Sequence, residues 1–94
     1  MNTSMRPKRK TPSVTELIRV GKVLESDPGV RPYLDEKTLR FSKRTGEVVY
    51  FSSGVVRVAG ALMAKGLNPE RAHVGIILRT AVEVFAIRRG RDPR

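Results

Sequence analysis

The stretch that decides the fold covers residues 38–51 and reads TLRFSKRTGEVVYF. Two runs rich in β-branched and aromatic side chains, TLRFS and EVVYF, stand on either side of the loop-forming segment KRTG. This arrangement predicts a β-hairpin. A three-residue loop with Gly46 in the left-handed conformation would pair Lys43 with Glu47.

The loop also sets the register of the two expected strands, 38–42 and 47–51. On the inner face it places Phe41 opposite Val49 and Leu39 opposite Phe51; on the outer face it places Arg40 opposite Tyr50, flanked by Ser42 and Val48. A slip of one residue would exchange the two faces. The hairpin is therefore predicted more firmly than its register.

An amphipathic helix is expected before the hairpin, over residues 13–26. Its start, Ser13-Val14-Thr15-Glu16, has the form of a capping box, in which the serine hydroxyl and the glutamate carboxylate satisfy the first free amides. Apolar or small residues then recur at helical spacing, at Val14, Leu17, Ile18, Gly21 and Leu24. Asp27-Pro28-Gly29 ends the helix, and residues 27–37 are expected to form a connection.

Two helices are expected after the hairpin. The first begins at Ser52 or Ser53, runs to about Lys65 and ends at a left-handed Gly66. The second begins at Asn68-Pro69-Glu70, which offers an N-cap, a proline at the first position and an acid near the positive end of the helix dipole. It runs to about Arg89 and is apolar around most of its circumference, so it needs cover on nearly all sides. A homodimer would supply that cover through Val74, Ile77, Leu78, Ala81 and Phe85.

The 94 residues predict one α+β domain over residues 12–87, with a basic segment on each side. Residues 1–11 contain four Lys or Arg and no acid, and we expect them to form a disordered basic arm. Residues 88–94 contain four arginines and one aspartate and form a basic tail. The formal net charge is +10, and most of it lies in these two segments. Basic ends on a nearly balanced core indicate polyanion binding by arms.

The sequence offers little for catalysis. The absence of cysteine excludes disulfides, thiolate metal sites and cysteine nucleophiles, and it fits a reducing compartment. His73 is the single histidine and has no nucleophile at a signature spacing, and no glycine pattern matches a phosphate-binding loop. Asp35 and Glu36, beside Lys37, are typical of solvated acids rather than of a magnesium site. We therefore expect no enzyme, no metal and no cofactor.

The features that favour binding are the basic arm and the hairpin tip. The arm sequence Arg6-Pro7-Lys8-Arg9-Lys10 is typical of segments that follow a phosphate backbone or enter a minor groove. At the tip, three cations beside a tyrosine would suit backbone clamping and base stacking. An ordinary solvated hairpin would show the same residues. The expected nucleic-acid-binding residues are Arg6, Lys8, Arg9, Lys10, Arg40, Lys43, Arg44 and Tyr50.

These patterns predict a small, cytoplasmic, homodimeric nucleic-acid-binding protein of phage or plasmid type, with DNA favoured over RNA and a role in transcription regulation. One alternative is an adaptor that binds a larger nucleic-acid machine such as a polymerase, through the apolar third helix or through Val48 and Tyr50. Another is a ribosome-associated RNA-binding protein. No apolar run approaches the roughly 20 residues needed to cross a bilayer, so no membrane partner is expected.

Overall fold

The computed structural model describes residues 11–88 of the chain. The elements are α1 (Val14–Glu25), a short 3-10 helix η1 (Arg31–Tyr33), β1 (Lys37–Ser42), β2 (Val48–Ser52), α2 (Ser53–Ala64) and α3 (Val74–Phe85). The two strands form an antiparallel hairpin. The expected α+β order of helix, hairpin and two helices is confirmed.

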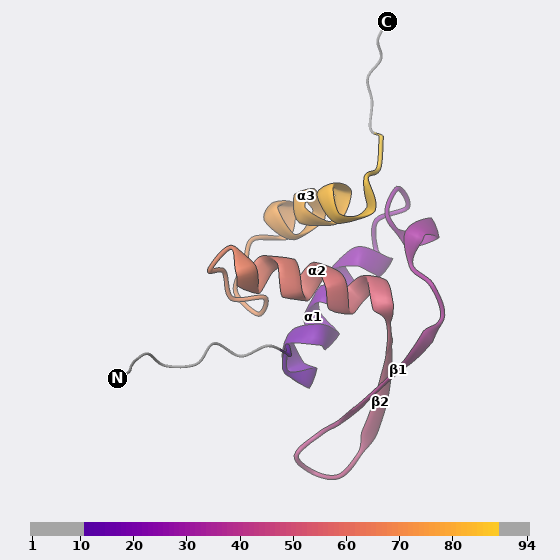
Figure 1. The fold of residues 1–94 in the computed structure, drawn as a ribbon, viewed down its shortest axis with the longest axis vertical. Helices are drawn as coiled ribbons and strands as arrows, with labels where there is room; N and C mark the ends of the chain where they lie inside the picture. Colours follow the sequence, from indigo (N-terminus) through magenta and orange to yellow (C-terminus); the bar gives the residue numbers. More distant parts are fainter. Residues whose placement is uncertain (1–10, 89–94) are drawn as a thin grey trace, which may run out of the picture.

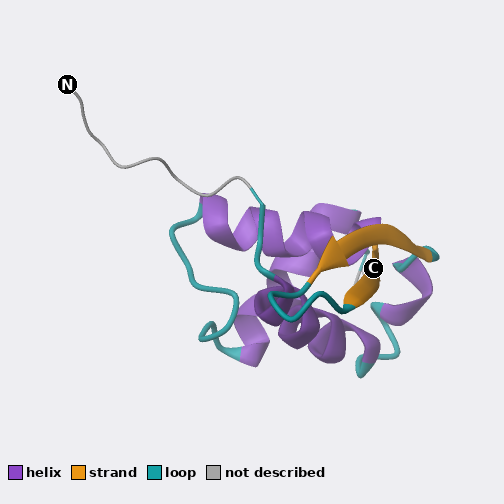
Figure 2. Cartoon of the chain, turned by 90° about the horizontal axis from the view of Figure 1, so that it is seen from below, coloured by secondary structure: helices purple, strands orange, loops and turns teal. Residues whose placement is uncertain are grey.

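The three helices pack on one another around a single core, and the hairpin projects from them (Figure 1). Seen from the hairpin end, the strands lie across the helices (Figure 2). Each helix buries one stripe: Leu17, Val20 and Leu24 from α1, Val55, Val58 and Leu62 from α2, and Ile77 and Ala81 from α3. Full burial of each larger side chain stabilises the fold by about 1.5–3 kcal/mol relative to exposure.

The hairpin has the expected loop and register. Gly46 adopts a φ of 94°, and the backbone N–H of Lys43 donates to the carbonyl of Glu47 at 2.7 Å. The cross-strand pairs include Phe41 with Val49, Leu39 with Phe51, Arg40 with Tyr50 and Ser42 with Val48. Leu39 remains 37% exposed, next to an irregularity in the ladder, so the inner face is less completely covered than expected.

The ends of α1 and α2 follow the signals in the sequence to within about one residue. Ser13 and Glu16 form the capping box, with Ser13 N–H donating to Glu16 Oε1 at 2.8 Å and Glu16 N–H donating to Ser13 Oγ at 3.2 Å. Ser52 caps α2 by accepting from the backbone N–H of Val55. After α2, Gly66 is left-handed with a φ of 80°, as expected for a helix stop.

The predicted start of the third helix is wrong, because α3 begins at Val74 and not at Asn68-Pro69-Glu70. The Asn68 side chain accepts from the backbone N–H of Glu70 and closes a turn there. The guanidinium of Arg19 in α1 donates hydrogen bonds to the carbonyl oxygens of Pro69, at 3.0 Å, and Ala72, at 2.7 Å. A continuous helix would use these carbonyls for its own ladder.

The predicted end near Arg89 is also wrong, since α3 ends at Phe85. Ala86 adopts the left-handed conformation with a φ of 54°. The backbone N–H groups of Ala86 and Ile87 donate back to Glu83 and Val82, which is the Schellman pattern. Glycine usually occupies this position, so alanine gave no stop signal in the sequence.

Candidate functional site

The hairpin tip contains one cation that forms an ion pair within the fold and two that do not. Lys43 Nζ lies 3.1 Å from Glu47 Oε1 in an ion pair across the loop. The Arg40 and Arg44 side chains are exposed and have no hydrogen-bond or ion-pair partner within residues 11–88. Tyr50, opposite Arg40 on the outer face, is 49% exposed. The tip therefore presents two uncompensated guanidinium groups and one accessible ring.

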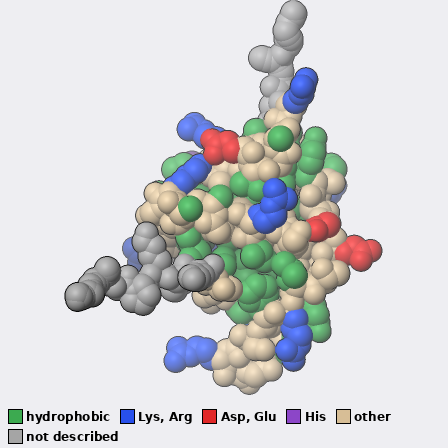
Figure 3. Space-filling model, viewed as in Figure 1, with side chains coloured by type: hydrophobic (Ala, Val, Ile, Leu, Met, Phe, Trp, Pro, Cys, Tyr) green, Lys and Arg blue, Asp and Glu red, His purple; other side chains and the backbone are tan. Residues whose placement is uncertain are grey.

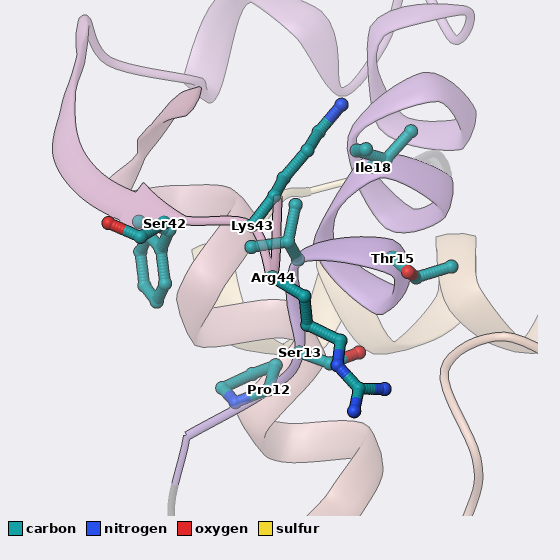
Figure 4. Close-up of a pocket in the computed structure, with 9 residues that line it drawn as sticks. Pro12, Ser13, Thr15, Ile18, Ser42, Lys43 and Arg44 are labelled. Carbon is teal, nitrogen blue, oxygen red and sulfur yellow. The ribbon is translucent and has the colours of Figure 1, made fainter. Parts of the chain in front are cut away.

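A cavity of about 530 Å³ separates the hairpin tip from the start of α1. Its lining comes from two segments: Pro12, Ser13, Val14, Thr15 and Ile18, and Phe41, Ser42, Lys43 and Arg44. In Figure 4 the Arg44 side chain extends towards Pro12 and Ser13, whereas Lys43 extends the other way, towards Ile18. The two segments are far apart in the sequence, and packing brings them to the same place.

The place where these two segments meet is also where the predicted basic arm joins the domain. Arg6, Lys8, Arg9 and Lys10 lie outside the described residues. The chain nevertheless enters the described region at residues 11–13, and Pro12 and Ser13 line the cavity together with Lys43 and Arg44. The point from which the arm leaves the domain is thus beside the hairpin tip.

A second hollow, of about 260 Å³, lies between α1 and the hairpin, and Ile18 lines both hollows. Lys22 and Tyr50 contribute to its lining, and the ion pair between Lys37 and Glu25, at 3.0 Å, closes one side. Figure 3 shows a hydrophobic surface between the hairpin and the helices, with Lys and Arg side chains projecting near the hairpin. The hairpin side of the molecule therefore joins an apolar surface to cationic side chains.

The five residues predicted for a dimer interface have different surroundings. Ile77 and Ala81 are fully buried in the core of their own chain, so a partner would not reach them. Phe85 is half-buried and stacks on Tyr33, with ring centroids 6.1 Å apart, under the Arg57 guanidinium. Val74 is 45% exposed and Leu78 half-buried. The core of the same chain therefore covers the face of α3 that contains Ile77 and Ala81, without a second protomer.

Asp35 and His73, the remaining candidates for catalysis or metal binding, accept hydrogen bonds from backbone N–H groups. Asp35 receives hydrogen bonds from Ser53 Oγ at 2.5 Å and from the Gly54 N–H at 3.4 Å, at the start of α2. The Ser53 bond is the main reason that the pKa of Asp35 lies below its ordinary value. His73 caps α3 by accepting at Nδ1 from the Gly75 N–H at 3.0 Å. Residues 11–88 contain no group of acids, histidines or cysteines that could hold a metal ion.

Sequence reasoning missed the cavity-lining residues Val14, Thr15, Ile18 and Phe41. Val14, Ile18 and Phe41 look like ordinary core positions of an amphipathic helix and an inward strand face. The space between them exists only because the fold places the hairpin tip opposite the start of α1. The capping box at Ser13 was the available signal, because it fixed where α1 begins relative to the basic arm.

Comparison of the chain with protein-family models, curated proteins and solved structures finds no match. Within residues 11–88, every helix is too short or too polar to cross a membrane.

Proposed function

We propose that the protein binds nucleic acid through one cationic surface formed by the hairpin tip and the basic arm. The observation that carries the proposal is the shared cavity, which puts Pro12 and Ser13, where the arm begins, beside Lys43 and Arg44. Residues 1–10 contribute four cations and no acid. A polymer of phosphates that contacts the tip would therefore pass close to the point at which the arm joins the domain, which favours polyanion binding.

The unpartnered guanidinium groups support this function. Paired cations must give up their partner before they bind a phosphate, whereas Arg40 and Arg44 have none within the described part of the chain. Guanidinium groups also bind phosphate oxygens in a bidentate manner. Tyr50, on the same outer face as Arg40, offers a ring on which a base can stack.

The test is a double substitution, Lys43→Gln with Arg44→Gln, measured by fluorescence anisotropy over a salt series. We expect weaker binding and a shallower dependence of log affinity on log salt, by about 0.9 per lost contact on duplex DNA or about 0.7 on a single strand. The matched control is Arg31→Gln with Arg79→Gln, which removes the same charge from exposed positions in η1 and α3 that have no side-chain partner within residues 11–88. Equal losses in both variants would indicate a general charge effect and contradict the proposal.

A truncated chain that lacks residues 1–11 separates the arm from the tip. We expect it to retain salt-dependent binding at reduced affinity, because the tip remains. Binding that disappears entirely would assign the activity to the arm alone. DNA and RNA probes of the same length, single-stranded and duplex, test the prediction that DNA is favoured.

A protein-interaction adaptor is the second candidate, and α3 is the element that favours it. Val74 is 45% exposed and Ile76 39% exposed, and they flank the buried stripe of Ile77 and Ala81 on its two sides. Exposed apolar side chains on one helix suit a protein partner. The two candidates differ in their surface, since the tip substitutions would leave an adaptor's binding unchanged.

A further inference from the structure

We propose that the cavity between the hairpin tip and the start of α1 receives an unpaired nucleobase, so that the preferred ligand is a single-stranded nucleic acid. This inference rests on the proposed function, because it assigns a ligand class to the same surface. The cavity volume of about 530 Å³ falls within the range of about 300–1,000 Å³ that is usual for small-molecule sites. A base with its sugar is a ligand of that size class.

The lining of the cavity suits the faces of a base. Val14, Ile18 and Phe41 are only partly buried by the rest of the fold and expose apolar surface to the cavity. The Phe41 ring is held edge-on to Phe51, with centroids 5.7 Å apart. An aromatic ring held in this way can stack on a base of any sequence, and the aliphatic side chains add apolar contact. A site that bound only a phosphate backbone would need no apolar lining.

The rim of the cavity suits the backbone of the strand. Arg44 is unpartnered within residues 11–88 and extends along the rim towards Pro12 and Ser13 (Figure 4). Thr15, in the first turn of α1, is exposed, and its side chain also has no hydrogen-bond partner among the described residues. Its hydroxyl can donate to or accept from the edge of a base. Arg44 could therefore bind a phosphate at the rim while the Thr15 hydroxyl forms a hydrogen bond with a base inside the cavity.

Duplex nucleic acid and acidic peptides fit these features less well. The bases of a duplex are stacked and paired, so filling the cavity would require unstacking at a cost. An acidic peptide could use the cations at the rim. Its carboxylates would leave the apolar lining of Val14, Ile18 and Phe41 unused, however, whereas a base would cover that lining. The combination of an apolar cavity and cations at its rim favours a single strand.

The first test compares three probes with equal numbers of phosphates on the full chain: a single strand, the same strand with abasic sites, and a duplex. We expect the intact single strand to bind at least about five-fold more tightly than the abasic strand, which lacks only bases. It should also bind more tightly than the duplex. Abasic and intact strands of equal affinity would overturn the inference while leaving the proposed function intact. Failure of every nucleic acid to bind would contradict both.

The second test locates the base. Phe41→Leu removes the ring from the cavity lining and should reduce the affinity for the intact strand towards that for the abasic strand. Tyr33→Leu is the matched control, because it removes a ring at an exposed position that does not line the cavity. Circular dichroism checks that both variants fold. A Phe41→Leu variant that folds and keeps the full preference for the intact strand would place the base elsewhere and overturn the inference.

Poly-glutamate of matched charge serves as the peptide competitor. We expect it to displace the labelled single strand less effectively than the unlabelled intact strand does, because it has no bases to enter the cavity. Displacement equal to that by unlabelled intact strand would show that bases contribute nothing, and would overturn the inference in favour of an acidic polypeptide.

Discussion

Gly54 and Gly60 lie on the same helix, α2, and have different surroundings. A Cβ atom on Gly54 would lie 2.9 Å from Phe85 Cζ and 3.3 Å from Leu34 Cδ2. A Cβ atom on Gly60 would have no neighbour within 4 Å. Gly54 is therefore required for the close approach of the Phe85 ring to α2, whereas Gly60 only adds backbone freedom to the unfolded chain.

The two glycines give opposite predictions for the free energy of unfolding. Gly60→Ala should raise it by up to about 1 kcal/mol, the difference in helix propensity. Gly54→Ala gains the same propensity but has to displace the Phe85 ring from its stack on Tyr33, so we expect a net loss of about 1–3 kcal/mol. Urea unfolding followed by circular dichroism measures both. Equal effects of the two substitutions would contradict the close packing at Gly54.

Asp35 links stability to pH. Its pKa is lowered from an ordinary value of 3.8, chiefly by the hydrogen bond from Ser53, with the Gly54 N–H adding to the effect. A carboxyl whose pKa is lower in the folded state stabilises the fold above its unfolded pKa and loses that contribution as pH falls through the folded pKa. Asp35→Asn should therefore lower the melting temperature near neutral pH, and the difference from the wild type should shrink below about pH 3.8. A difference that stays constant down to acid pH would contradict this role.

At the scale of elements, Arg19 holds the segment that precedes α3. Its guanidinium binds two carbonyls of the segment between α2 and α3, and this contact ties that segment to α1. Arg19→Met should lower the free energy of unfolding by about 2 kcal/mol, since two charge-assisted hydrogen bonds are lost and their carbonyls remain. Arg79→Met on α3 is the control and should change it by less than about 0.5 kcal/mol, because Arg79 is exposed. Equal losses would show that Arg19 acts only through its charge.

The elements that could be predicted from the sequence are those whose signals are local. The capping box at Ser13, the loop glycine Gly46 and the stop at Gly66 each act within a few residues, and all three were found at their expected places. The segment before α3 is bound by Arg19, which is distant in sequence, and α3 ends at an alanine in a conformation that favours glycine. The cavity depends on packing between α1 and the hairpin, which no local pattern reports.

At the scale of the whole molecule, the interface of the expected homodimer has to be formed by the side chains of α3 that remain accessible. Val74 and Leu78 lie one turn apart and remain accessible, while Ile77 and Ala81 are buried. We expect sedimentation equilibrium to detect a dimer that Val74→Asp converts to monomer. Aspartate in the first turn favours the helix dipole, so the fold should persist. Ile76→Asp is the control, because it also removes an exposed apolar side chain from that turn but lies on another side of the helix. A monomeric wild-type protein would contradict the dimer.

The ion pair between Lys43 and Glu47 has a consequence for discrimination among anions. Glu47 acts as a tethered counter-ion, and any ligand that uses Lys43 has to displace it. A lone phosphate or carboxylate competes poorly, because the tethered carboxylate has a high effective concentration. A polymer that engages several cations at once offsets the loss of this single pair. Glu47 therefore weakens the binding of a small dissolved anion at Lys43 more than it weakens the binding of a polyanion.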